Sequence, residues 1–155
     1  MQARSVAGVP TLWTIGYEKL RPEALVAELE AASVQRLIDV RFRPQSRRPG
    51  MSKTKLGLLL AEHQIVYEHR RSLGTPPELR WLYKNRRVAE GAQGFAQHIE
   101  ATASDELDAF AAELEDPAAP RTALLCLEAE PAECHRRVLA EHLRERLPRL
   151  SVIDL

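Results

Sequence analysis

The sequence predicts an α/β fold with a mainly parallel central sheet of about five strands and helices on both of its faces. Three observations support this prediction. Strand-like and helix-like segments alternate along the chain. The most continuous apolar segment, Ala123 to Leu127, is typical of a central strand buried on both faces. No internal repeat competes with this pattern, and the 155 residues suit a single domain, expected over residues 1–155.

Five segments have the composition and the boundaries of strands. The first is β-rich and ends at Gly16, the second ends in Asp39-Val40-Arg41, and the third is the weakest. Turn-forming residues or helical patterns follow each of the first four, so we expect crossovers that place the strands parallel. The five expected strands are Thr11 to Ile15, Arg36 to Val40, Ile65 to Tyr67, Ala123 to Leu127 and Ser151 to Ile153.

The segments between these strands carry apolar residues at helical spacing. Ser104 is expected to be an N-cap, and Pro131 is expected to open the last helix. The longest segment is expected to be helical in pieces, because Gly91 and Gly94 interrupt its apolar pattern. The expected helices are Pro22 to Ala32, Lys53 to His63, pieces of Glu78 to Ala103, Ser104 to about Asp116, and Pro131 to about Leu147.

The net charge of zero conceals a marked asymmetry. Residues 36–87 contain 13 Lys and Arg against 4 Asp and Glu, a net of +9, whereas residues 88–133 contain 1 against 11, a net of −10. Two interpretations stay open. The basic block forms a positive surface suited to phosphate or nucleic acid, or the two blocks neutralise each other across the fold.

Composition also bears on location and redox state. The chain has no apolar window of the roughly 18 residues that a membrane span needs and no signal peptide pattern, so we expect a cytoplasmic protein without a membrane partner. Cys126 and Cys134 are expected to be free thiols. Two cysteines do not complete a structural zinc site by themselves, so no metal is indicated.

Polar residues follow the expected strands at the point where each one ends. They include Gly16 with Tyr17, Asp39 with Arg41, and Glu128. In an open parallel sheet the ligand crevice lies outside the carboxyl ends of the strands. The sequence therefore predicts that these residues meet in one crevice, where Tyr17 would stack on a ring or cap a pocket.

The densest group of reactive side chains is Cys134-His135-Arg136. An expected helix N-terminus and Arg136 favour a thiolate at Cys134, which makes it a candidate nucleophile, although a small core residue is the alternative. His135 is a candidate acid or base, or a core histidine. Arg136 is suited to grip a carboxylate or phosphate, and a structural ion pair with Asp39 or Glu128 would use the same geometry.

Asp39 and Arg41 are expected to point to the same side of the second strand. Asp39 would act as a base, or the two would form a buried salt bridge. The basic loop that follows is a candidate anion cradle, with a solvated loop as the alternative. Neither a Walker loop nor a glycine-rich dinucleotide motif is present, so no cofactor is expected. The polar residues of this loop are Arg43, Ser46, Arg47, Arg48, Lys53 and Lys55.

Together these motifs resemble the DUF488 family. The resemblance runs from about residue 12 to residue 143 and implies a small cytoplasmic prokaryotic α/β protein without an assigned function. Two departures concern ligand details: Met51 replaces a common aromatic residue, and Thr75 replaces a frequent second glycine. The family's motif positions fall on Gly16, Tyr17, Asp39, Arg41, Pro44, Ser46, Gly74, Cys126, Glu128, Cys134, His135 and Arg136.

The leading hypothesis is an enzyme-like pocket for a phosphorylated or nucleic-acid-derived ligand, anchored by Arg41, Arg136 and the loop of residues 43–53. In that pocket Asp39, Glu128 and His135 would supply acid or base. One alternative is a non-catalytic nucleic-acid-binding domain. Another is a metal or redox site formed by Cys126, Cys134 and His135, with Glu128 as a further candidate. The substrate, the occurrence of catalysis and the oligomeric state are left open by the sequence.

Overall fold

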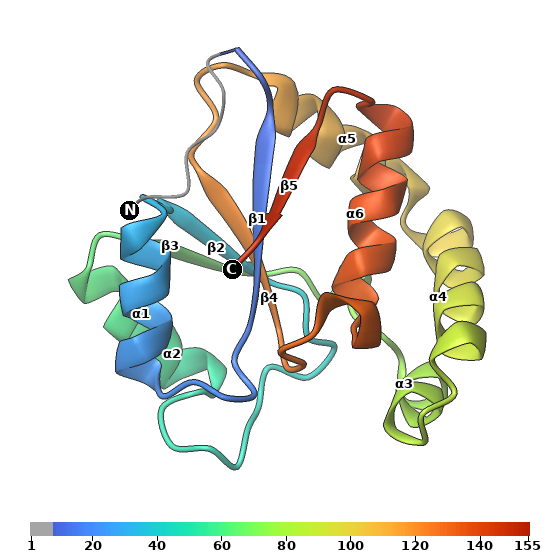
Figure 1. Ribbon diagram of the computed structural model, residues 1–155, viewed down its shortest axis with the longest axis horizontal. Coiled ribbons are helices and arrows are strands. Elements are labelled where there is room, and N and C mark those ends of the chain that lie inside the picture. Colours follow the sequence, from blue (N-terminus) through green and yellow to red (C-terminus); the bar gives the residue numbers. More distant parts are fainter. Residues whose placement is uncertain (1–7) are drawn as a thin grey trace.

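The computed structural model describes residues 8–155 and contains one five-stranded, all-parallel sheet with the strand order β3-β2-β4-β1-β5 (Figure 1). This architecture confirms the predicted α/β class. The central strand is β4, the continuous apolar segment, and all of its residues are buried. The strands are β1 (Thr11–Gly16), β2 (Arg36–Asp39), β3 (Val66–His69), β4 (Thr122–Cys126) and β5 (Ser151–Asp154).

Helices cover both faces of the sheet (Figure 1). Two lie on one face, three lie on the other, and α3 packs against α4 beside the carboxyl ends of the strands. Short 3₁₀ turns at Arg71–Leu73 and Pro131–Glu133 precede α3 and α6. The first group is α1 (Pro22–Ala31) and α2 (Lys53–Glu62); the second is α4 (Val88–Thr102), α5 (Ser104–Glu115) and α6 (His135–Arg146), with α3 at Pro77–Lys84.

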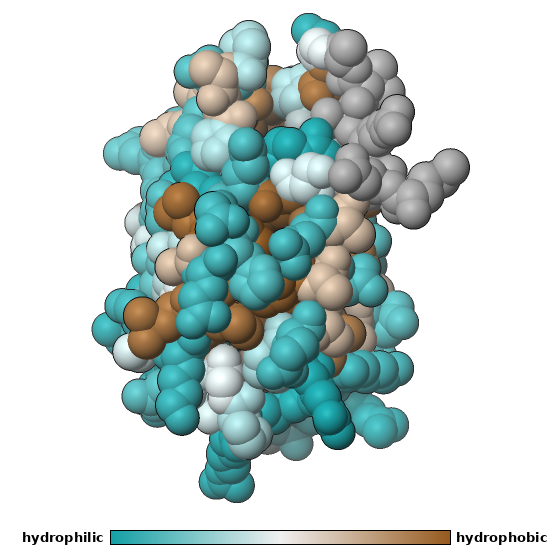
Figure 2. Space-filling view, turned by 90° about the vertical axis from the view of Figure 1, so that its left-hand side faces the viewer, coloured by the Kyte–Doolittle hydropathy of each residue, from teal (hydrophilic) through white to brown (hydrophobic). Residues whose placement is uncertain are grey.

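The sheet separates two hydrophobic cores because successive residues of a strand point to opposite faces. Along β1, Leu12 packs among α4, α5 and α6, while Trp13 packs with α1 and α2. Figure 2 shows the side of the molecule formed by α1 and α2, where hydrophobic patches interrupt a largely hydrophilic surface. Within residues 8–155, no helix is both long and apolar enough to cross a membrane.

The segment Glu78 to Ala103 is helical in pieces, as predicted, but the break falls at residues 85–87, between α3 and α4. Helix α4 continues through Gly91 and Gly94, where the missing side chains leave room for α3: a Cβ would lie 3.0 Å from Tyr83 at Gly91 and 2.6 Å from Leu79 at Gly94.

Two expected helix starts were wrong. Ser104 is the first residue of α5 rather than its cap. After Pro131 the chain makes only a 3₁₀ turn, and α6 begins four residues later.

Candidate functional site

The ends of β1, β2 and β4 meet at one edge of the sheet, as predicted. Gly16 is in register with Cys126, and Asp39 is in register with Leu125. The pairing continues beyond the strands, since Val40 donates its N–H to the carbonyl of Leu125. This edge therefore brings together motifs that lie more than a hundred residues apart in the chain.

Asp39 and Arg41 form a buried salt bridge, one of the two interpretations that the sequence allowed. The Asp39 carboxylate accepts from Arg41 Nε at 2.9 Å and from Nη2 at 2.7 Å, and both residues are almost inaccessible to solvent. Tyr67 also donates its hydroxyl to Asp39. Burial lowers the pKa of Arg41, but the hydrogen bond and the charge of Asp39 outweigh it, so the net pKa is raised.

The rest of the Arg41 guanidinium is also bound by the protein. Nη1 donates to the carbonyl of Met51 at 2.8 Å and reaches the hydroxyl of buried Tyr17 at 3.4 Å. The carbonyl of Arg41 lies 2.7 Å from Nε2 of His69, at the end of β3. Arg41 thus ties the loop after β2 to its neighbours and presents no free donor to solvent.

Arg136 is buried, and no carboxylate of residues 8–155 forms an ion pair with it. Its Nη1 donates to the carbonyl of Glu128 at 2.7 Å and its Nη2 to that of Ala129 at 3.0 Å, whereas its Nε has no partner in the described chain. Gly16 makes room for this side chain, because a Cβ there would lie 2.6 Å from Arg136 Nη1 and 1.7 Å from the carbonyl oxygen of Glu128. Burial lowers the pKa of Arg136.

His135 is the first residue of α6 and lies in the interior. Its Nε2 donates to the carbonyl of Val40 at 2.8 Å, because a carbonyl can only accept. The ring meets Phe95 of α4 edge to face, with centroids 5.2 Å apart. Burial lowers the pKa of His135 to about 4, so the imidazole is neutral at pH 7. We call Asp39, Arg41, His135 and Arg136 the buried polar layer.

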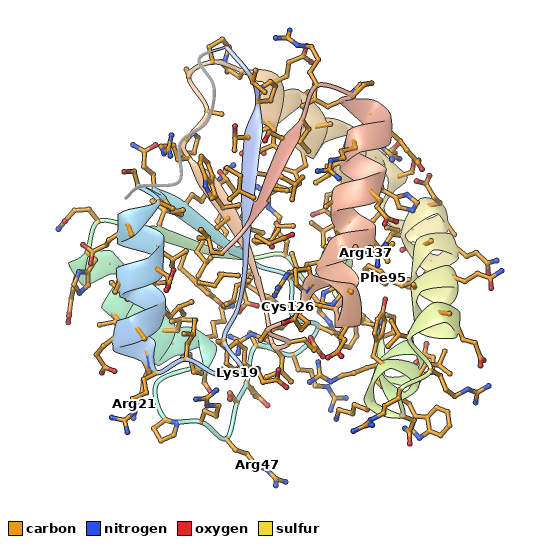
Figure 3. All side chains as sticks on the ribbon, in the orientation of Figure 1. Lys19, Arg21, Arg47, Phe95, Cys126 and Arg137 are labelled. Atoms are coloured by element: carbon orange, nitrogen blue, oxygen red, sulfur yellow. A yellow bond between two sulfur atoms is a disulfide. The ribbon has the colours of Figure 1, made fainter. Side chains whose placement is uncertain are left out.

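Cys126 and Cys134 are joined by a disulfide, which corrects the expectation of free thiols. The sequence suggested free thiols because nothing in it pointed to an oxidising compartment. The fold brings the end of β4 to the start of α6, where Cys134 is the N-cap and its sulfur accepts the N–H of Arg136 at 3.5 Å. Figure 3 shows Cys126 at this junction, with Phe95 projecting from α4 toward α6.

Glu128 is the predicted acid or base that is least enclosed. It is half-buried in the connection after β4, and burial raises the pKa of its carboxyl group. The charge of Arg80, on α3, opposes that rise and also contributes to the low pKa of His135. Helix α3 therefore belongs to the surroundings of this edge.

The basic loop between β2 and α2 is held in shape by its own polar residues. Ser52 Oγ accepts the N–H of Ser46 at 3.0 Å, and Ser46 Oγ accepts that of Arg48 at 3.1 Å. Lys53 donates its N–H to the carbonyl of Pro44. The Arg48 guanidinium donates to the carbonyl of Tyr17 at 2.7 Å. Ser46 and Arg48 thus organise the loop, while Lys53 lies exposed at the start of α2.

A cleft of about 530 Å³ separates this loop from α3, and we call it the basic cleft. It contains four cationic side chains and no carboxylate. Trp81 is 53% exposed, and the hydroxyl of buried Thr75 has no hydrogen-bond partner in the described chain. Figure 3 shows Arg47 reaching out from the loop at the carboxyl edge of the sheet. The cleft is lined by Phe42, Arg43, Gln45, Arg47, Thr75, Pro77, Arg80, Trp81 and Lys84.

The interpretation that the two charge blocks neutralise each other holds for one part of the basic block. Arg36 pairs with Glu113 of the acidic block, and Arg70 lies 3.5 Å from the same carboxylate, so these charges are neutralised across the fold. In contrast, none of the four cations of the basic cleft forms an ion pair with a residue of the described chain.

Sequence reasoning identified Arg43 as a ligand-binding residue and Arg47 as part of the basic loop, but it missed the half of the cleft that comes from α3. Arg80, Trp81 and Lys84 were assigned only to an uncertain helical segment. The spacing of Arg80 and Lys84 by one helical turn, with an aromatic residue beside them, was the available signal. Gly16, Tyr17, Arg41 and Arg136 lie inside the protein instead of lining the cleft.

The fold and this edge define an open parallel α/β protein with a polar, basic carboxyl end. The chain belongs to the DUF488 family: the description "Domain of unknown function DUF488" matches residues 21–143. A search of the curated proteins found no match, and a search of the solved structures found none either.

Proposed function

We propose that this protein binds a phosphorylated, nucleic-acid-derived small molecule of the nucleotide class in the basic cleft. The observation that carries the proposal is the grouping of four cations, none in an ion pair within the described residues, with an exposed tryptophan at the carboxyl edge of a parallel sheet. Guanidinium groups bind phosphate through paired hydrogen bonds, and an indole provides a face on which a base can stack.

Each part of the cleft has a chemical role in this proposal. Arg43 and Arg47 on one wall and Arg80 on the other would hold the phosphate between them. Trp81 would stack on the base, and the Thr75 hydroxyl would gain the partner that it lacks. The buried polar layer would fix the loop that carries the first wall, because Arg41 binds the Met51 carbonyl at its far end.

A narrower proposal is catalysis by Glu128, which does not line the basic cleft but is influenced by the charge of Arg80, one of its lining residues. Asp39 and His135 are already engaged by Arg41 and by the Val40 carbonyl, whereas Glu128 is half-buried with a raised pKa, as a general acid requires. We keep the cytoplasm as the proposed location, since this is where a free nucleotide ligand is available.

Binding is tested by titrating the protein with adenosine 5′-monophosphate, inorganic phosphate and adenosine while recording tryptophan fluorescence. Only Trp81 of the two tryptophans is exposed, because Trp13 lies in the core. We expect Arg43→Ala and Arg80→Ala each to weaken monophosphate binding about tenfold or more, the effect of losing one charge-assisted hydrogen bond.

Arg137→Ala is the matched control, since Arg137 is exposed on α6, away from the cleft lining, and pairs with Glu141. Unchanged dissociation constants in folded Arg43→Ala and Arg80→Ala proteins would overturn the proposal. A single-stranded oligonucleotide titrated at several salt concentrations tests the nucleic-acid-binding alternative. A steep salt dependence together with much tighter binding than the monophosphate would favour that alternative.

A further inference from the structure

Beyond the basic cleft, we propose that the reduced protein binds one Zn²⁺ ion through Cys126, Cys134 and His135. These three residues are buried at the junction of β4 and α6, and their sulfur and nitrogen atoms all lie within 4.8 Å of one another. Two thiolates and one imidazole are ligands that zinc prefers in proteins. The ion would therefore occupy the position of the disulfide once that bond is reduced.

The spacing of two of the donors already suits the metal. Cys134 Sγ and His135 Nδ1 lie 3.7 Å apart. In a tetrahedral site with a Zn–S bond of about 2.3 Å and a Zn–N bond of about 2.0 Å, a sulfur and a nitrogen ligand are separated by about 3.5 Å. The backbone thus presents this pair at the separation that a shared zinc ion needs.

The imidazole of His135 is in the tautomer that a metal ligand requires. Its Nε2 carries the proton, because it donates to the carbonyl of Val40 at 2.8 Å, so the neutral ring leaves a lone pair on Nδ1, which faces Cys134. A hydrogen bond from the second ring nitrogen to a carbonyl is the usual support of a metal-bound histidine. No movement of the ring is needed for it to serve as a ligand.

Both sulfur atoms have N–H donors of the kind that stabilise thiolates. Arg136 supplies its backbone N–H to Cys134 at 3.5 Å and its Nη1 to Cys126 at 3.4 Å. No carboxylate of residues 8–155 forms an ion pair with the buried guanidinium, so an anionic sulfur in contact with it would add to the charges of Asp154, Glu128 and Glu130. The two Cα atoms lie 7.4 Å apart. Disulfides usually span about 4.4–6.8 Å between Cα atoms, so the backbone leaves room for an ion between the reduced sulfurs.

The chemistry balances in two steps. A phosphine reductant supplies two electrons and takes up the oxygen of one water molecule as phosphine oxide, and the two protons of that water convert the disulfide into two thiols. Zn²⁺ then binds both sulfurs as their two protons leave to solvent, and it accepts the lone pair of His135 Nδ1. The three protein ligands leave a fourth position, which water would complete.

The experiment uses the full chain, reduced with a phosphine and freed of metal, and titrated with zinc chloride against a chromophoric chelator. We expect one zinc per chain, and at least a hundredfold weaker binding in Cys126→Ser, Cys134→Ser and His135→Gln, since loss of an outer-shell partner alone costs about 10–100-fold. His142→Gln is the control, because His142 belongs to a separate surface cluster with Glu100 and Glu145.

Two measurements on the unaltered protein keep the proposal testable if a variant fails to fold. Co²⁺ should give sulfur-to-metal charge-transfer absorption, and Zn²⁺ should protect both thiols from alkylation. The proposal is overturned if the reduced, folded protein binds no zinc, if its thiols react equally with and without zinc, or if only His142→Gln lowers the zinc content. Binding of nucleotides in the basic cleft is measured separately, so either proposal can fail alone.

Discussion

Arg41 and Arg43 are two residues apart in the chain, yet they belong to regions with opposite characters. Arg41 lies in the buried polar layer, where Asp39 and main-chain carbonyls take up its donors. Arg43 lines the basic cleft, is exposed and has no ion-pair partner in the described chain. An arginine side chain therefore stabilises the fold in one region, whereas in the other it is exposed to solvent.

The comparison separates charged groups that stabilise the fold from charged groups that the fold leaves exposed. Buried charged groups need counter-charges or hydrogen bonds within the protein, so substitutions there are expected to cost stability. Charges on the rim are unpaired and repel one another, and removing them should cost binding instead. The four predictions below test this division, beginning with the largest expected effect on the free energy of unfolding.

Asp39→Ala should lower the free energy of unfolding by about 3–5 kcal/mol, because it leaves Arg41 buried without its counter-charge. Urea denaturation followed by circular dichroism measures the change. Asp108→Ala is the control: Asp108 also pairs with an arginine, Arg146, but at the surface, and should cost under about 1 kcal/mol. Equal losses in the two variants would contradict the division between the regions.

Gly16→Ala should lower the free energy of unfolding by about 3 kcal/mol or more, because a Cβ would overlap the Glu128 carbonyl and displace Arg136. Gly57→Ala in α2 is its counterpart. The nearest atom to that Cβ, in Tyr67, would lie at 3.6 Å, an ordinary contact, and alanine favours the helix by about 0.5–1 kcal/mol. The melting temperature should therefore fall for Gly16→Ala and rise for Gly57→Ala.

Tyr67→Phe should cost about 1 kcal/mol, since it removes one hydrogen bond to a carboxylate that keeps its bonds to Arg41. Tyr83→Phe is matched to it, because the Tyr83 hydroxyl is buried and has no partner in the described chain. Removing that hydroxyl should leave the protein as stable as before or more so. A larger loss for Tyr83→Phe than for Tyr67→Phe would be inconsistent with this account.

Arg43→Ala and Arg80→Ala should change the free energy of unfolding by less than about 0.5 kcal/mol, as surface substitutions usually do. Any change should be toward higher stability, because neighbouring cations no longer repel each other. Denaturation at low and at high salt measures both effects, and added salt should reduce the difference between variant and parent. A loss of several kcal/mol would place these arginines with the buried polar layer.

Much of the fold was predictable because the order of apolar and polar residues indicates which segments are buried. The continuous apolar run Ala123 to Leu127 correctly indicated the central strand, within one residue of its bounds. Helix limits were harder where packing decides them. Gly91 and Gly94 look like helix breakers in the sequence, but they are sites where α3 approaches α4 closely.

The sequence predicted where the candidate site lies but not which side chains are exposed there. The strand-end motifs meet because parallel strands share one carboxyl edge. Which way a side chain points after a strand ends depends on the turn that follows, so the sequence left a buried Arg41 as one of two alternatives and did not indicate that main-chain carbonyls bind Arg136. The contribution of α3 and the Cys126–Cys134 disulfide depend on tertiary approach, which spacing along the chain does not encode.

The position of β4 at the centre of the sheet has a consequence for how the chain is made. Strands β1 and β2 both pair with β4 rather than with each other, so neither gains its inner neighbour until the last third of the polypeptide has been translated. Until β4 has been synthesised, the apolar residues of β1 and β2 belong to an incomplete sheet. The growing chain therefore depends on a late segment to close its core, and this delays folding on the ribosome.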